Sequence, residues 1–241
     1  MTHLAFLSFV SQTSPARRIK FAESVVEFLR KYNFDGLDLD WEYPVTRQGK
    51  PEDYGNYPLL VKAIKDAFEA SGRDYLLTMA IPINPDKLDK GYNMASLARS
   101  VDWFHLMSYD IYGAWGDVAG SNTDLGYIKK TVEKSILSRG VSGEQLVLGL
   151  ASYGRSMVLR DPTCATAGCP IDGAGMQGCS GEAGFSPLFE LMEKHVRTGN
   201  YDSLLLNPTT GSMEMVLQGN IFVSLDVVDT FEMKRDYYLS E

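Results

Sequence analysis

The sequence predicts an α/β protein built around a parallel sheet that helices cover on both faces. Up to about Gly154, apolar runs of strand length alternate with segments whose apolar residues recur at helical spacing. These runs are too apolar for either face of a strand to meet water, which is typical of parallel sheets. A later stretch rich in Gly, Pro and Cys breaks the alternation, so we expect a small insertion at about residues 155–220.

The expected elements follow one another in a regular order. Arg17 to Tyr32 has the apolar spacing of a helix with one buried stripe, and Asn33 suits its C-terminal end. Four βα units come next. The expected strands are residues 35–42, 75–82, 101–110 and 145–154, and the helices between them are residues 52–70, 94–99 and 127–137. A helix-like segment at 186–196, a polar strand-like region reaching Asp226 and a final helix at 230–238 complete the chain.

Composition limits the expected partners. The chain has 241 residues, of which 44% are hydrophobic and 22% charged, the profile of a globular protein with a sizeable core. Its formal net charge of -8 would repel a phosphate backbone, so nucleic acid is not an expected partner. The apolar run from Leu4 to Val10 has no basic region before it and no small-residue cleavage site after it. We therefore expect neither a signal peptide nor a membrane span there.

The three cysteines, Cys164, Cys169 and Cys179, all fall in the Gly- and Pro-rich stretch. A structural zinc site normally needs four Cys or His ligands, and no His lies in this stretch, so zinc is the weaker hypothesis. One disulfide plus one unpaired thiol is expected in an oxidising compartment. Three reduced cysteines without a special role remain the simplest alternative.

Four acidic residues crowd the stretch "FDGLDLDWEYP". They are Asp35, Asp38, Asp40 and Glu42. In an extended segment side chains alternate between faces, so the last three share one face and the apolar residues between them share the other. Alternate Cα atoms are then roughly 6.6 Å apart. Repulsion and burial raise the pKa of at least one carboxyl at such spacing, and a carboxyl that stays protonated near neutral pH is a general acid.

Two other interpretations of this cluster compete with the acid–base one. A solvated acidic turn would not need the apolar residues Leu37, Leu39 and Trp41 between the acids. A divalent-cation site is possible in principle because carboxylates bind Mg²⁺, Mn²⁺ and Ca²⁺. The position of Glu42 favours catalysis, since it ends the expected strand, and parallel α/β sheets carry their chemistry at that end.

The acidic stretch resembles the D-x-x-D-x-D-x-E signature of glycoside hydrolase family 18, the chitinases and their relatives, with all four acids present and "WEYP" following. Further segments are similar to that family in the same order: "LLTMAIP", "MSYDIYGAW", "LVLGLASYGRS", "CSGEAGFSPLFEL" and "IFVSLDVVDTFEMK", the last two as in fungal members. Residues 1–241 would form a partial catalytic domain of this family. The resemblance implies an incomplete TIM-type (β/α)8 barrel that begins after the third strand and ends before the eighth.

The resemblance also implies an activity and its catalytic residues. Chitinases of this family cleave β-1,4 bonds between N-acetylglucosamine units, and the substrate's own 2-acetamido group attacks the anomeric carbon to give an oxazolinium intermediate. By motif position, Glu42 would protonate the leaving oxygen and later activate water. Asp40 would hold the acetamido nitrogen, Asp38 would share the proton of Asp40, and Tyr109 would donate to the acetamido oxygen.

Further substrate-binding positions are implied at Asp35, Tyr43, Met107, Asp110, Trp115, Tyr153 and Arg155. Trp115 matches a sugar-stacking position, although an aromatic or Met residue on a barrel strand usually packs in a core, and a lone Arg usually makes a surface ion pair. The chain departs from the family pattern at Tyr112, Gly116, Ser152, Phe222 and Leu225. These departures weaken sugar stacking and leave a second hypothesis open, a chitin-binding or killer-toxin-like relative with little or no turnover.

The partners follow from the same resemblance. We expect chitin or chitooligosaccharides as ligands, no cofactor, no nucleic acid, no membrane association and a monomer. The parent protein would be extracellular, and the cysteines agree with that expectation.

Overall fold

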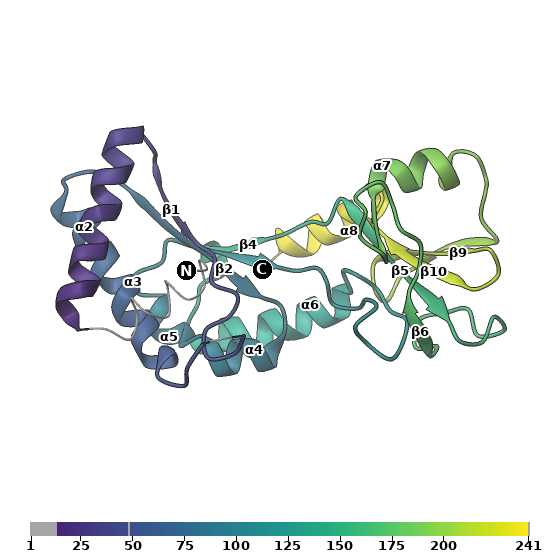
Figure 1. Cartoon of the computed structure of the whole chain (residues 1–241), viewed down its shortest axis with the longest axis horizontal. Helices are drawn as coiled ribbons and strands as arrows, with labels where there is room; N and C mark the ends of the chain where they lie inside the picture. The colour runs from purple at the N-terminus through teal and green to yellow at the C-terminus, as the bar shows by residue number, and fades with distance from the viewer. Residues whose placement is uncertain (1–13, 48, 241) are drawn as a thin grey trace. The chain divides into compact units, whose positions relative to one another are not determined.

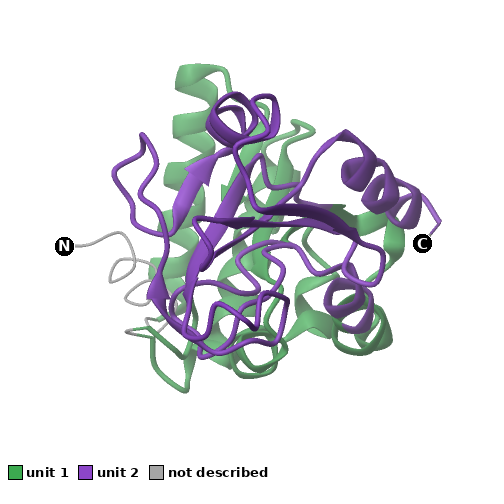
Figure 2. Cartoon of the chain, turned by 90° about the vertical axis from the view of Figure 1, so that its right-hand side faces the viewer, with its two compact units in different colours: residues 1–107, 131–147 green, residues 108–130, 148–241 purple. Residues whose placement is uncertain are grey.

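The computed structural model describes residues 14–47 and 49–240 of the chain, shown in Figure 1. It divides into two compact units, coloured separately in Figure 2: residues 1–107 with 131–147 form unit 1, and residues 108–130 with 148–241 form unit 2. The run from Leu4 to Val10 lies outside the described residues. No helix of the described part combines the length and apolarity needed to cross a membrane.

The sheet of unit 1 has the strand order β1-β2-β3-β4, which is also their order along the chain. The strands are β1 (Gly36–Leu39), β2 (Leu76–Pro82), β3 (Trp103–Met107) and β4 (Leu146–Leu148). β2 pairs in parallel with both β1 and β3, with Asp38 opposite Thr78 and Ala80 opposite His105. Residues 77–82 of β2 are all buried, as a strand covered on both faces requires. The predicted α/β class with a parallel sheet is confirmed.

Two long helices of unit 1, α2 (Pro15–Tyr32) and α3 (Asp53–Ala70), pack against each other. Figure 1 shows them side by side next to β1. The buried side chains of α2 recur every three or four residues: Ala22, Val25, Val26 and Leu29. Asn33 ends α2 in the left-handed conformation, with φ of 54°, which Asn tolerates better than most residues. Both helices match the apolar periodicity of the sequence.

The shorter helical segments are less regular than predicted. They are α4 (Pro85–Gly91), α5 (Met94–Leu97), α6 (Leu125–Thr131), the π-helical η1 (Val132–Ile136) and the 3₁₀ turns η2 (Leu137–Arg139) and η3 (Gly143–Gln145). The expected helix at 127–137 therefore changes hydrogen-bonding pattern twice. α4 was not predicted, although Asn84 caps it by accepting the Lys87 N–H at 3.1 Å and Pro85 begins it. An Asn–Pro pair is a recognised start signal for a helix.

The bounds of three predicted strands were wrong. The strand expected at 101–110 is β3, which covers only Trp103–Met107. The strand expected at 35–42 ends at Leu39, because the carbonyl of Trp41 accepts the Tyr92 hydroxyl at 2.8 Å instead of a strand partner. The strand expected at 145–154 is two strands, since β4 ends at Leu148 and β5 (Tyr153–Leu159) belongs to another sheet. Between them the carbonyl of Gly149 accepts the Ser108 hydroxyl at 2.8 Å, so this segment leaves the ladder.

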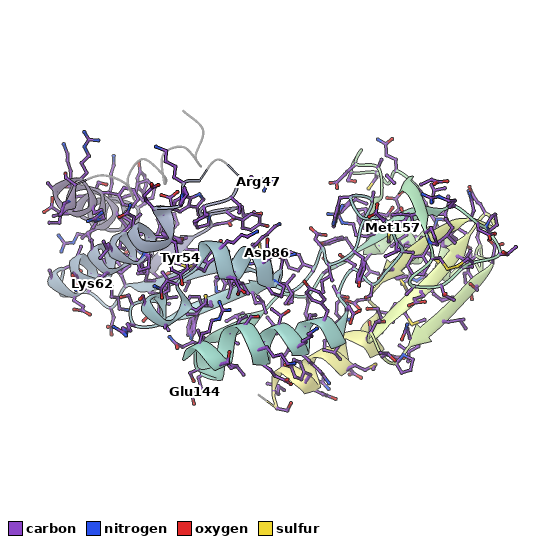
Figure 3. All side chains as sticks on the ribbon, turned by 90° about the horizontal axis from the view of Figure 1, so that it is seen from below. Arg47, Tyr54, Lys62, Asp86, Glu144 and Met157 are labelled. Carbon is purple, nitrogen blue, oxygen red and sulfur yellow. A yellow bond between two sulfur atoms is a disulfide. The ribbon has the colours of Figure 1, made fainter. Side chains whose placement is uncertain are left out.

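Unit 2 holds an antiparallel sheet of six strands in the order β6-β5-β10-β9-β8, with β7 paired to β5. Its remaining strands are β6 (Ile171–Ala174), β7 (Phe185–Pro187), β8 (Ser203–Asn207), β9 (Ser212–Leu217) and β10 (Ile221–Leu225). Besides most of α6, its helices are α7 (Leu188–Leu191), the π-helical η4 (Met192–Val196) and α8 (Val228–Tyr238). Phe222 packs with Met157, labelled in Figure 3, whereas Val223 packs with Met215 and Leu191. Because neighbouring residues of β10 point to opposite faces, this sheet has an apolar core on each side.

The cysteines take the arrangement of one disulfide with one unpaired thiol. Cys164 and Cys169 are bonded, with their Cα atoms 5.7 Å apart, and Cys179 is free and exposed. Cys169 is 3% exposed and lies in the core cluster of Met157 and Phe222. Within the described ranges, no three His, Cys, Asp or Glu side chains are grouped so as to hold a metal ion.

Glu190 ties the loop before β7 to the helical segment after it. Its carboxylate, 4% exposed, accepts the backbone N–H of Cys179 at 2.8 Å and pairs with Lys194. The hydrogen bond from Lys194 and then that from Cys179 lower the pKa of Glu190 from 4.5 to about 2. Folding therefore favours the ionised form, so this contribution to stability is fully present above about pH 4.5 and is lost as the pH falls toward about 2.

We expect Glu190→Gln to lower the melting temperature at neutral pH, because the neutral amide cannot replace the carboxylate toward Lys194. The difference in melting temperature between wild type and variant should shrink as the pH falls from about 4.5 to about 2. Glu193→Gln is the matched control, because it removes the same charge from an exposed ion pair with Arg197 on the same helical segment. Thermal unfolding by circular dichroism across this range tests the prediction, and identical pH behaviour of the two variants would contradict it.

Candidate active site

The acidic segment leaves β1 with its side chains on alternating faces. Leu39 and Trp41 are 4% and 1% exposed, whereas Asp38 and Asp40 are exposed and Glu42 is partly exposed. The alternation continues past the end of the strand at Leu39. The carboxyl side chains therefore avoid the apolar side of the segment, where the buried neighbours lie.

Trp41 anchors this segment between its two acidic neighbours. Its ring packs edge-on against Tyr57 at a centroid distance of 5.0 Å, and Tyr57 is fully buried. Its carbonyl accepts the Tyr92 hydroxyl at 2.8 Å, and Tyr92 is 1% exposed. Because both side chain and main chain of Trp41 are held, the directions of the residues on either side are fixed as well.

Asp38 is held by two side chains from the neighbouring strands. The Thr78 hydroxyl on β2 donates to Asp38 Oδ1 at 2.6 Å. His105 Nδ1, on β3, lies 3.2 Å from the same oxygen and forms an ion pair with it when the imidazole is protonated. Side chains from three adjacent strands thus meet at the carboxylate of Asp38. Sequence reasoning missed Thr78 and His105, although Thr78 is the single polar residue in the run "LLTMAIP".

Glu42 lies in a polar environment formed by the loop that follows it. Arg47 Nη1, a residue labelled in Figure 3, is 3.5 Å from Glu42 Oε2. Burial raises the pKa of the Tyr43 hydroxyl well above its ordinary value, and the hydrogen bond with Glu42 raises it further. Lys87 Nζ lies 4.1 Å from the centre of the Tyr43 ring. Tyr43 therefore stays a neutral hydrogen-bonding group beside Glu42 over the working pH range of proteins.

The loop after Glu42 approaches α4 closely. A Cβ atom on Gly91 would lie 2.8 Å from the carbonyl oxygen of Pro44, closer than ordinary contact allows. Gly91 therefore permits the loop to rest on the end of α4. The loop contains two left-handed residues, Val45 with φ of 67° and Arg47 with φ of 49°.

In unit 2, Asp110 is the centre of a second polar cluster. Asp110 Oδ1 accepts the Tyr153 hydroxyl and Arg155 Nε, both at 2.8 Å. Burial, followed by the charge of Asp110, raises the pKa of Tyr153. Tyr109 lies next to it, with its ring 6.2 Å from that of Tyr153 in an edge-on arrangement. Asp110 itself has φ of 55°, in the left-handed region that Asp tolerates.

Arg155 connects this cluster to aromatic rings. It is 9% exposed, so it is not the surface residue that a lone Arg would usually be, and its Nη1 donates to Glu182 at 2.6 Å. Its guanidinium carbon lies 5.1 Å from the Trp115 and Phe185 rings. Burial lowers the pKa of Arg155, but the hydrogen bonds to Asp110 and Glu182 outweigh that effect and raise it. Trp115 is 61% exposed and so has ring surface free for a ligand.

The structure therefore groups the expected site residues in three clusters, each within one unit. The clusters are Asp38 with Thr78 and His105, Glu42 with Tyr43 and Arg47, and Tyr109, Asp110, Tyr153 and Arg155 with Trp115. Asp35 and Met107 stand at strand ends, where the Asp35 carbonyl accepts the Leu76 N–H at 3.0 Å and Met107 pairs with Pro82. Glu182 and Phe185 were not predicted.

The acidic residues on the last part of β1 and just after it lie at the end of a parallel sheet where α/β enzymes carry their chemistry, and paired carboxylates are a general feature of glycoside hydrolases. The chain belongs to glycosyl hydrolases family 18, because the family model matches residues 3–240. The predicted family is therefore confirmed.

Known relatives agree with this assignment. The chain is 34% identical to Chitinase A1 of Niallia circulans over 266 aligned residues. The aligned region covers 97% of this chain and 36% of the relative. It is 31% identical over 246 residues to a probable endochitinase of Caenorhabditis elegans, covering 95% of this chain and 38% of the relative. The chain thus spans little more than a third of the length of these two relatives.

Solved structures show the same fold. The Group IV chitinase of Ostrinia furnacalis matches with a TM-score of 0.89 and 28% identity, over 97% of this chain and 66% of that one. A mutant class V chitinase from Nicotiana tobaccum in complex with NAG4 matches with a TM-score of 0.86 and 25% identity, over 99% of this chain and 70% of that one. These neighbours confirm the TIM-type barrel fold class. The parallel strands of unit 1 are consecutive strands of such a barrel.

Proposed function

We propose that the protein is a chitinase that hydrolyses β-1,4 bonds of N-acetylglucosamine polymers by a substrate-assisted, retaining mechanism. The observation that carries the proposal is the acidic segment, in which Asp38, Asp40 and Glu42 alternate with the buried Leu39 and Trp41. A segment anchored by its apolar side presents carboxyl groups in fixed positions. Such preorganisation is what acid–base catalysis on a sugar needs.

In this mechanism Glu42 donates its proton to the glycosidic oxygen as the bond from that oxygen to the anomeric carbon breaks. The acetamido oxygen of the substrate forms the new bond to the anomeric carbon and gives an oxazolinium ion. Asp40 holds the acetamido nitrogen, and Asp38 shares the proton of Asp40 early in the cycle. Glu42 then takes a proton from water, and the water oxygen attacks the anomeric carbon. The bond from the acetamido oxygen to the anomeric carbon breaks, which opens the oxazolinium ring.

The polar cluster of unit 2 is proposed to serve substrate binding. Tyr109 donates to the acetamido oxygen. Asp110 holds the neighbouring side chains of Tyr153 and Arg155 through the hydrogen bonds that it accepts from them. The exposed ring of Trp115 offers a stacking surface for a sugar. Asp35, Tyr43 and Met107 remain proposed substrate-binding positions on the strength of the motif alone.

Two measurements on the same sample test the function. Chitooligosaccharides are incubated with the protein, new reducing ends are quantified, and binding to insoluble chitin is measured in parallel. Release of reducing ends supports the chitinase. Binding without release would support a chitin-binding or toxin-like relative instead, and loss of activity on chelation would favour the divalent-cation alternative.

The hydrogen bond from Thr78 to Asp38 gives a smaller prediction. Thr78→Val keeps the shape of the side chain but removes the donor, whereas Thr78→Ser keeps the donor. Hydrogen bonds to charged groups contribute about 1.5–3 kcal/mol, and solvent screening reduces that at a half-exposed carboxylate. We therefore expect kcat to fall about threefold to tenfold in Thr78→Val and to stay near wild type in Thr78→Ser. Steady-state hydrolysis of a chitooligosaccharide measures both, and equal kcat values would contradict the role of Thr78.

We also propose that the protein acts outside the cell as a monomer, without a cofactor, on chitin or chitooligosaccharides. The disulfide between Cys164 and Cys169 supports an oxidising compartment, where such bonds persist. The net charge of -8 supports the absence of a nucleic-acid partner.

A further inference from the structure

Asn122 is a buried polar residue whose side chain makes two hydrogen bonds to the proposed substrate cluster, and the mechanism above does not use it. It is 1% exposed and lies in the segment before α6. Its Oδ1 accepts the backbone N–H of Asp110 at 2.9 Å, and its Nδ2 donates to the carbonyl of Tyr153 at 3.4 Å. The carboxamide carries its acceptor and its donor on separate atoms, so Asn122 can make both contacts at the same time.

The main chain of Asn122 is fixed on the sheet of unit 2. Its N–H donates to the Ser224 hydroxyl at 2.9 Å, and Ser224 is fully buried on β10. Its carbonyl accepts the N–H of Ile111 at 3.1 Å. The side chain and the main chain of Asn122 thus hold two consecutive N–H groups of the segment that follows β3.

Asp110 needs such a clamp because its backbone conformation is unfavourable. Its φ of 55° lies in the left-handed region, which Asp adopts more readily than most residues but still at a free-energy cost that the surrounding structure must offset. The peptide unit that Asn122 grips is the one between Tyr109 and Asp110. The orientation of that unit decides where the Tyr109 ring points and how the Asp110 carboxylate meets Tyr153 and Arg155.

We infer that Asn122 is a positioning residue for the reaction: it locks the Tyr109–Asp110 peptide so that Tyr109 is in place for the acetamido group. The expected effect of Asn122 on kcat rests on the proposed chitinase function. The expected effect of Asn122 on the backbone of Asp110 does not. Asn122 contacts none of the proposed reacting atoms. Its side chain acts through the two backbone groups that it holds, the N–H of Asp110 and the carbonyl of Tyr153.

Hydrogen exchange tests the clamp directly. In Asn122→Ala the Asp110 amide should exchange at least about tenfold faster, because its acceptor is gone. The Ile111 amide should keep its protection, since its acceptor is the main-chain carbonyl that alanine retains. Asn220→Ala is the matched control: Asn220 lies at the β9–β10 turn of the same unit, and its substitution should change neither amide. Unchanged exchange at Asp110 in Asn122→Ala would overturn the inference.

Kinetics separate a positioning role from a purely structural one. We expect kcat for chitooligosaccharides to fall about tenfold or more in Asn122→Ala while KM changes less than about threefold, because Tyr109 is proposed to act as the acetamido oxygen attacks. Ser224→Ala provides a milder variant if Asn122→Ala does not fold, with a smaller loss of kcat and partial loss of Asp110 protection. Faster exchange with unchanged kcat would overturn the positioning role. If the wild type releases no reducing ends, the proposed function fails, and the exchange experiment still decides the clamp.

Discussion

Glu42→Gln is expected to slow chitooligosaccharide hydrolysis by about 100-fold to 10,000-fold, the range that a positioned general acid and base contributes. The amide has the same shape as the carboxyl but carries no proton that it can give to the leaving oxygen. Binding should persist, because Trp41 anchors the segment through Tyr57 and Tyr92 independently of Glu42. The measurement is kcat from reducing-end release, together with affinity from calorimetry of the same variant.

Glu69→Gln is the matched control for this prediction. Glu69 is an exposed residue near the C-terminal end of α3 in the same unit, so the substitution removes one negative charge away from the acidic segment. It should hydrolyse at the wild-type rate. Turnover of Glu42→Gln within about threefold of that control would remove Glu42 from the mechanism.

The regular part of unit 1 could be predicted from the sequence because local patterns determine it. α2 and α3 follow the 3.6-residue recurrence of their apolar residues, and β2 follows its continuous apolar run. The boundary between β4 and β5 could not be predicted in the same way. The residues from Leu146 to Gly154 form one largely apolar run of strand length, and the change of sheet depends on hydrogen bonds to distant partners such as Ser108.

The candidate site shows the same division between local and distant information. The alternation of Asp38, Asp40 and Glu42 with apolar residues is a local pattern, so it could be recognised from spacing alone. Thr78 and His105 reach Asp38 from strands that lie 40 and 67 residues further along the chain. Their proximity depends on the register of β1, β2 and β3, which the sequence spacing does not reveal.

A second large effect is expected in the buried ion pair of unit 2, between Lys234 on α8 and Asp226 at the end of β10. Lys234 is fully buried and Asp226 is 2% exposed. Lys234 Nζ donates to the carbonyl of Gly211 at 2.6 Å as well as to Asp226 Oδ1. The other carboxylate oxygen of Asp226 accepts the Thr123 hydroxyl at 2.7 Å. The pair thus joins α8, the start of β9 and the segment before α6.

Lys234→Met is expected to destabilise the protein by about 3–5 kcal/mol, because it leaves the Asp226 carboxylate buried without its counter-charge. For a chain of this size that corresponds to a fall in melting temperature on the order of 10 °C. Lys130→Met, which removes an exposed lysine from α6 in the same unit, is the matched control and should change the melting temperature little. Thermal unfolding at neutral pH measures both variants.

The double variant Lys234→Met with Asp226→Asn separates the charge from the packing. If the cost of Lys234→Met comes from the unpaired carboxylate, making that group neutral should recover part of the lost stability, so the double variant should melt above the single one. If the cost comes instead from lost packing and from the freed carbonyl of Gly211, the second substitution should lower the melting temperature further. The hydrogen bond from Thr123 to Oδ2 of Asp226 favours the first outcome, because an asparagine with its amide oxygen at that position can still accept it.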